Sequence, residues 1–167
     1  GDVFPALALG VGEGDRAKMR RPPRDSSEPI FTRSHWAVAV AYGLLITVPV
    51  LISLHIAQHG LGLESSRAVT ISFLTLAFSR LWHVFNMRDP GSGFFVNEET
   101  RNPYVWGALA LCSLLLIGAV YTPLVSDALS LVPPTARQWA LIIGMSLVPW
   151  AVVQPVKGIM GMMRRSG

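Results

Sequence analysis

The chain has 167 residues, of which 51% are hydrophobic and 14% are charged, and its formal net charge is +4 with a mean hydropathy of +0.44. This composition is far more apolar than that of an average soluble domain, so it excludes an ordinary water-soluble protein and predicts a membrane protein. A single cysteine, Cys112, excludes a disulfide framework and a paired-cysteine metal site.

The first predicted element, residues 1–10, is an apolar run that carries an acid, Asp2, and a proline, Pro5. Nine helical residues at ~1.5 Å each reach about 13 Å, less than half of a bilayer. We therefore expect the second half of a truncated transmembrane helix. An ionised carboxylate at membrane depth is costly and favours a functional role. Pro5 would expose backbone carbonyls beside Asp2, giving part of an oxygen cage for a cation. The alternative is a cytoplasmic Asp2 without a role.

Residues 11–34 form a polar connector that is rich in basic residues, glycine and proline. Basic residues are also concentrated in the connector near residues 88–101 and after residue 156, whereas the two other connectors hold only Arg67 and Arg137. Under the positive-inside rule, the basic segments and the C-terminus are cytoplasmic.

Four long, weakly charged runs follow the connector and predict transmembrane helices at about 35–58, 67–87, 103–122 and 137–157. The predicted fold is therefore all-α: a polytopic membrane bundle over residues 35–167, with four full transmembrane helices preceded by half of another.

The second of these runs contains one buried charge, Arg80. It stands roughly 10 Å from the expected cytoplasmic end of its helix, at about the depth of Asp2. We hypothesise that Arg80 is a countercharge for Asp2 or for an acid on a helix outside this chain. The alternative is that its long stem carries the guanidinium to the headgroups.

Polar residues in the same run recur at spacings of three and four, within an arc of roughly 80° of a helix. This stripe is expected to face the bundle interior, where it serves helix packing or, as the less favoured alternative, a site. Its members are Ser72, Thr75, Ser79, His83 and Asn86. The chain contains no catalytic arrangement of a nucleophile and a base, and no phosphate-binding glycine loop.

Five stretches of the sequence together resemble one family. DVFPALALG followed by MRRPPRDSSEPIF resembles the sixth membrane helix and the next cytoplasmic loop of P-type cation-transporting ATPases, in particular bacterial relatives of calcium and sodium pumps. LAFSRLWHVFN, RNPYVWGALAL and QWALIIG resemble helices eight, nine and ten of that family.

The resemblance implies that Asp2 ligates the transported cation. It also implies that residues 11–34, with Arg21, Pro22, Pro23 and Arg24, form a loop that couples the phosphorylation domain to the membrane. Acidic residues that calcium pumps carry in this loop are replaced here at Ala17 and Arg20.

In helix eight, calcium and sodium pumps carry acidic or amide ligands where this chain has Thr75, Phe78 and Arg80. This difference argues for fewer or different ions than in those pumps.

The family's phosphorylation, hinge and nucleotide-binding motifs are missing from the chain, so we expect no catalysis or cofactor in this piece itself. The resemblance implies that the parent protein uses ATP and Mg²⁺, forms an aspartyl-phosphate and drives cation movement.

The expected partners are membrane lipid and, in the same parent chain, the upstream transmembrane helices and the phosphorylation domain, with no nucleic acid. The expected location is a cell membrane, by resemblance a bacterial inner membrane, crossed several times with the C-terminus in the cytoplasm.

The residues alone raise two other classes. A free-standing four-helix structural or assembly subunit of a membrane complex would show the same four runs. A small channel or secondary carrier would show inverted repeats between its halves, and the sequence has none.

Overall fold

A computed structural model describes Leu7, residues 33–84 and residues 103–163, without the side chains of residues 34, 35 and 155–163. The helices are α2 (Arg33–His55), the π-helical turn η2 (Ile56–Gly60), α3 (Ser65–His83), α5 (Pro103–Tyr121), α6 (Pro123–Ala128) and α7 (Ala136–Met163). No strand occurs in these ranges, which confirms the predicted all-helical class for the described residues.

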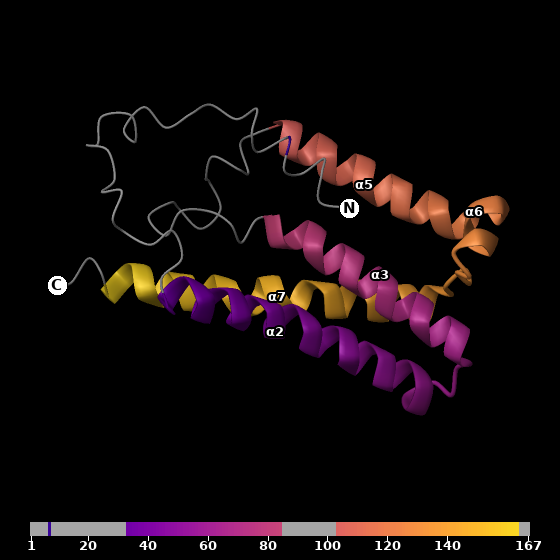
Figure 1. Cartoon of the computed structure of the whole chain (residues 1–167), viewed down its shortest axis with the longest axis horizontal. Coiled ribbons are helices and arrows are strands. Elements are labelled where there is room, and N and C mark those ends of the chain that lie inside the picture. Colours follow the sequence, from indigo (N-terminus) through magenta and orange to yellow (C-terminus); the bar gives the residue numbers. More distant parts are fainter. Residues whose placement is uncertain (1–6, 8–32, 85–102, 164–167) are drawn as a thin grey trace.

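The long helices alternate in direction along the molecule (Figure 1). α2 and α5 run one way, and α3 and α7 run the other way, so the start of α2 and the end of α7 lie at the same end of the bundle. This alternation is what successive crossings of a membrane produce. The opposite end holds η2, the start of α3, and α6.

Among the described residues, three stretches are long and apolar enough to cross a membrane: Trp36–Gly60, Pro103–Tyr121 and Ala136–Gln154. α3 has 19 residues but is not among them, since it carries two arginines and several hydroxyl side chains. Of the four membrane helices predicted, three are therefore supported by length and composition. α3 can be less apolar than the other long helices because it packs extensively against both α7 and α2, which leaves little of its own surface exposed.

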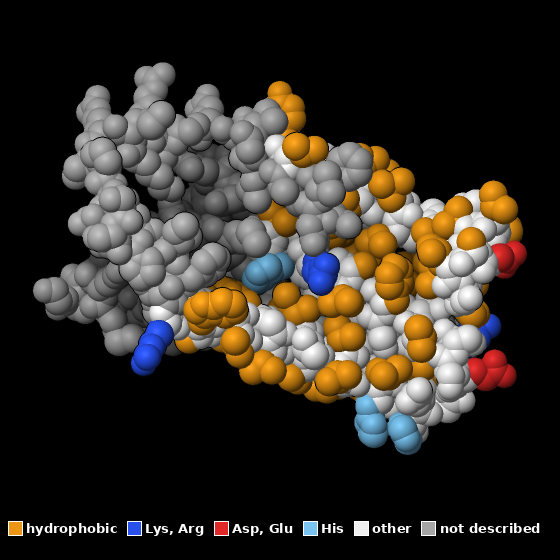
Figure 2. Space-filling view, in the orientation of Figure 1, with side chains coloured by type: hydrophobic (Ala, Val, Ile, Leu, Met, Phe, Trp, Pro, Cys, Tyr) orange, Lys and Arg blue, Asp and Glu red, His pale blue; other side chains and the backbone are white. Residues whose placement is uncertain are grey.

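The core of the molecule is built on α3, whose buried apolar residues recur at spacings of three and four: Ala68, Ile71, Leu74, Phe78 and Leu81. They pack with side chains of α5 and α7, including Val105, Leu109, Cys112 and Ile142. On the outer surface, α2 and α5 instead expose large apolar side chains, and orange covers much of the face in Figure 2. A protein with an apolar exterior and polar groups inside is suited to lipid rather than water.

Hydrogen bonds tie the helices together at the end that holds α6. Trp139 Nε1 donates to Tyr121 Oη over 2.9 Å, and the Tyr121 hydroxyl donates to the carbonyl of Pro134 over 3.4 Å. The backbone N–H of Val132 donates to Thr70 Oγ1 over 3.1 Å. The α6–α7 connection is thereby fixed to α3 and α5. Prolines begin both α5 and α6, where the missing N–H has no helical partner to lose.

Candidate functional site

The two central hydroxyls of the predicted polar stripe, those of Thr75 and Ser79, lie inside the bundle. Their side chains are 0% and 1% exposed. Thr75 Oγ1 donates to the carbonyl of Ile71 over 2.8 Å, within its own helix. Ser79 Oγ has no hydrogen-bond partner among the described residues. The Thr75 hydroxyl is therefore hydrogen-bonded within its own helix, whereas the buried Ser79 hydroxyl can still form a hydrogen bond with another group.

At the end of α3, His83 of the stripe and the adjacent Trp82 contact the two neighbouring helices. The half-buried His83 ring meets the Tyr42 ring of α2 edge-on, with centroids 4.9 Å apart. Next to it, Trp82 Nε1 donates to Ser146 Oγ of α7 over 3.2 Å. Ser146 is fully buried and donates in turn to the carbonyl of Ile143 over 2.9 Å. Polar residues here connect α3 to its neighbours.

Arg80 lies on a different face of α3 from this stripe. It is exposed, as are Val69 and Phe73, and at 100° per residue these three positions fall within about 40° of one another. Ser79 and Thr75 lie roughly 100° and 140° further round the helix. The structure thus brings Thr75 and Ser79 together in the core and turns Arg80 outward, onto the face that carries Val69 and Phe73.

The remaining predicted site residues lie outside the described residues: Asp2, Pro5, Arg21, Pro22, Pro23, Arg24 and, from the stripe, Asn86. The proposed pairing of Arg80 with Asp2 therefore rests on sequence alone. Within the described part, no group of three or more histidine, cysteine or acidic side chains is placed to hold a metal ion.

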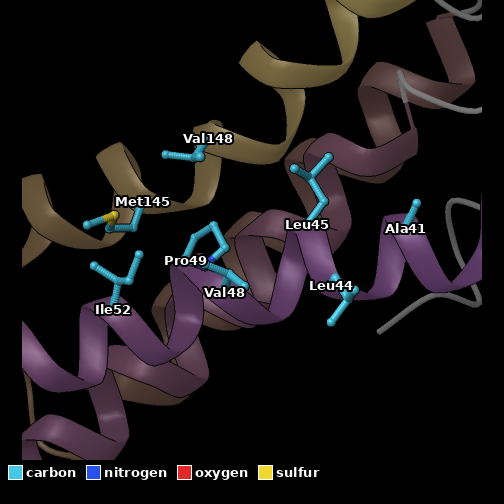
Figure 3. Close-up of a pocket in the computed structure, with 8 residues that line it drawn as sticks. All are labelled: Ala41, Leu44, Leu45, Val48, Pro49, Ile52, Met145 and Val148. Atoms are coloured by element: carbon cyan, nitrogen blue, oxygen red, sulfur yellow. The ribbon is translucent and has the colours of Figure 1, made fainter.

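A groove of about 550 Å³ runs between α2 and α7 (Figure 3). Leu45, Val48, Pro49 and Ile52 line it from α2, and Met145 and Val148 line it from α7, together with Ala41 and Leu44. All of these side chains are apolar, so the groove offers no ligand for a cation and no anchor for a polar substrate. It belongs to the apolar surface of the bundle.

Sequence reasoning missed a pair of stacked histidines at the end of α2. His55 and His59 are both exposed, and their rings stack with centroids 4.5 Å apart at an interplanar angle of 22°. The available signal was their spacing of four residues, which places two side chains on one helical face.

Residues 1–159 match the family described as "Cation transporting ATPase, C-terminus". The chain is 34% identical to a calcium-transporting ATPase of Bacillus subtilis, over 89% of this chain and 16% of the relative. It is 30% identical to a calcium-transporting ATPase of Listeria monocytogenes, over 93% of this chain and 17% of the relative. It is 28% identical to sodium/potassium exporting P-type ATPase 1 of Saccharomyces cerevisiae, over 88% of this chain and 16% of the relative. The chain thus spans about a sixth of the length of these relatives.

Proposed function

Because this chain belongs to the family of cation-transporting ATPase C-terminal domains, we propose that it is the C-terminal membrane part of a P-type ATPase that pumps cations. The parent protein would hydrolyse ATP with Mg²⁺ through an aspartyl-phosphate intermediate. The observation that carries the proposal is the match of residues 1–159 to the family. The described apolar helices fit it, since three of them can cross a membrane.

In this proposal, α3 also crosses the membrane, in addition to the three apolar helices. Its length of 19 residues is close to the roughly 20 that a bilayer requires. Its polar residues are tolerable because Thr75 and Ser79 are buried and the helix packs between α2 and α7. An odd number of crossings between α2 and α7 would also conflict with their opposite directions. The end at which α2 begins and α7 ends would be cytoplasmic.

The proposed ion site combines Asp2, as a ligand, with carbonyls exposed by Pro5. Arg80 would act near this site as a fixed positive charge. Two observations support this role: Arg80 lies on the exposed face of α3, and its neighbours on that face, Val69 and Phe73, are apolar. A guanidinium on such a face would favour contact with an anionic group over contact with acyl chains.

Calcium is the first ion to test, since two relatives that are 34% and 30% identical to this chain are calcium-transporting ATPases. A guanidinium repels cations and occupies space, so Arg80 favours fewer bound ions than a site built of acids and amides. The yeast relatives named for sodium and potassium export make these ions the next candidates.

The loop at residues 11–34 would transmit motion from the phosphorylation domain to the membrane helices. Its Arg21–Pro22–Pro23–Arg24 segment combines two stiff prolines with two charges that can engage an acidic surface. Membrane lipid and the upstream helices of the same parent chain would be the other partners, in a bacterial inner membrane.

The test uses the full-length protein reconstituted in sealed vesicles. We expect ATP-dependent uptake of labelled Ca²⁺ and formation of an acid-stable phosphoenzyme from ATP. Asp2→Asn should abolish uptake, because an amide supplies one neutral oxygen in place of a charged carboxylate. The matched control is Asp127→Asn, which changes an exposed acid of α6 in the same way and should leave uptake unchanged.

The proposed role of Asp2 is wrong if Asp2→Asn transports as the unmodified protein does. The proposed pump function is wrong if the unmodified protein forms no phosphoenzyme with Ca²⁺, Na⁺ or K⁺.

A further inference from the structure

His55 and His59 form a pair of ligands that the proposed function does not use. His55 is the last residue of α2, and His59 lies within the π-helical turn η2. Both side chains are exposed, and Figure 2 shows two histidine side chains next to each other at the edge of the molecule. Their rings are stacked, with centroids 4.5 Å apart and 22° between the ring planes. Two imidazoles are thus held side by side and open to solvent.

The backbone beneath the pair is firmly held. Leu61 N donates to Ile56 O over 2.9 Å, and Leu63 N donates to Ala57 O over 3.0 Å. Ala57 lies between the two histidines in sequence and is 0% exposed, which anchors the opposite side of the turn in the core. The two histidines therefore face outward from a fixed base, and binding a ligand would require only side-chain rotation. A site that is organised in advance loses less entropy on binding.

The chemistry of the pair selects one class of ligand. Two histidines four residues apart on a helix are a recurrent metal-binding arrangement, because both rings can reach one ion. Two nitrogens that each lie about 2.0–2.1 Å from one ion are about 3 Å apart, which a modest tilt of the stacked rings would achieve. Neutral imidazole suits Ni²⁺, Cu²⁺ and Zn²⁺, whereas Ca²⁺ and Mg²⁺ prefer oxygen. The other coordination positions would be filled by water.

We propose that His55 and His59 form a two-histidine site for a divalent transition metal ion. In the topology proposed above, the end of α2 faces away from the cytoplasm, so the ion would arrive from that side. The binding site itself does not depend on the pump function, since it needs only the two side chains and the turn that holds them.

The test uses the full-length protein in detergent, free of any polyhistidine tag and of nucleotide, with Ni²⁺ as the probe. Isothermal titration should give one Ni²⁺ site per chain that Ca²⁺ at millimolar concentration does not displace. His55→Asn and His59→Asn should each weaken this site at least tenfold. The double variant should also lose the weak binding that a single remaining imidazole gives.

The matched control is Gln58→Ala, which alters the same turn between the two histidines and should bind Ni²⁺ like the unmodified protein. A second measurement needs no variant: the electron paramagnetic resonance spectrum of one equivalent of Cu²⁺ should show coupling to two imidazole nitrogens. The proposal is overturned if both single variants retain the unmodified affinity, if millimolar Ca²⁺ displaces Ni²⁺, or if the spectrum lacks nitrogen coupling.

Discussion

Trp82 of α3 and Ser146 of α7 are joined by a hydrogen bond of 3.2 Å between Nε1 and Oγ. The bond links two helices that are separated by 64 positions in sequence, and its acceptor is fully buried. Inside a bundle in lipid, where apolar surface gives no preference between neighbours, such a contact helps to fix how the helices are rotated against each other.

Trp82→Phe should lower the free energy of unfolding by about 1 kcal/mol, because the indole donor is lost while Ser146 remains buried. Thermal unfolding of the full-length protein in detergent measures the effect. The matched control is Trp150→Phe, which removes the same atoms from a half-buried ring of α7 and should cost less. An equal loss in both variants would mean that ring volume, and not the hydrogen bond, stabilises the contact.

Ser79→Ala should leave the stability of the protein within about 0.5 kcal/mol of the unmodified value, because the hydroxyl that it removes has no partner among the described residues. The comparison is Ser53→Ala in α2, where an equally buried hydroxyl donates to the carbonyl of Val50 over 2.7 Å. That variant should lose about 1 kcal/mol. A larger loss for Ser79→Ala, measured by thermal unfolding, would reveal a partner from another part of the protein.

Gly62→Ala should destabilise the connection between η2 and α3 by about 1 kcal/mol. Gly62 has φ = 59°, in the left-handed region that a Cβ disfavours, although nothing lies within 4 Å of an added methyl group. Gly60→Ala is the control, since its Cβ would make an ordinary 3.5 Å contact with Ile56 Cγ2. Chemical or thermal unfolding should separate the two variants, and equal stabilities would contradict a purely conformational cost.

Arg80→Gln in the full-length pump should increase the number of ions moved per ATP or tighten the apparent ion affinity about tenfold, since a charge that repels cations is removed. Arg80→Lys keeps the charge and should stay close to the unmodified protein. Ion-dependent ATPase activity and vesicle uptake give both quantities. Unchanged values for Arg80→Gln would support the alternative in which the side chain extends to the headgroups.

Several features could be predicted because they depend on composition and local pattern. The low charge and long apolar runs were sufficient for the all-helical class and for the membrane character of three helices. The family was identifiable from short motifs such as DVFPALALG and RPPR, and the match to residues 1–159 confirms it.

The arrangement of the candidate site could not be predicted in the same way. From the sequence, the depth of Arg80 along its helix could be predicted. Depth does not give the direction in which the side chain points away from the helix axis. In the structure, Ser79 and Arg80 are adjacent in sequence, yet one is buried and the other exposed. The hydrogen bond from Trp82 to Ser146 depends on how α3 and α7 are rotated against each other. The stacking of His55 on His59 depends on a π-helical turn. The sequence carries no strong local signal for either the rotation or the turn.

The packing of α3 has a consequence for how the chain is made. A ribosome releases α3 well before α7, although α7 supplies much of the surface on which α3 rests. During that interval the indole of Trp82 lacks its acceptor, Ser146 of α7, and α3 can pack only against the helices already made, chiefly α2. A chain that ends before residue 136 would lack α7 and with it much of the surface that covers α3, so we expect it to be less stable than the complete bundle.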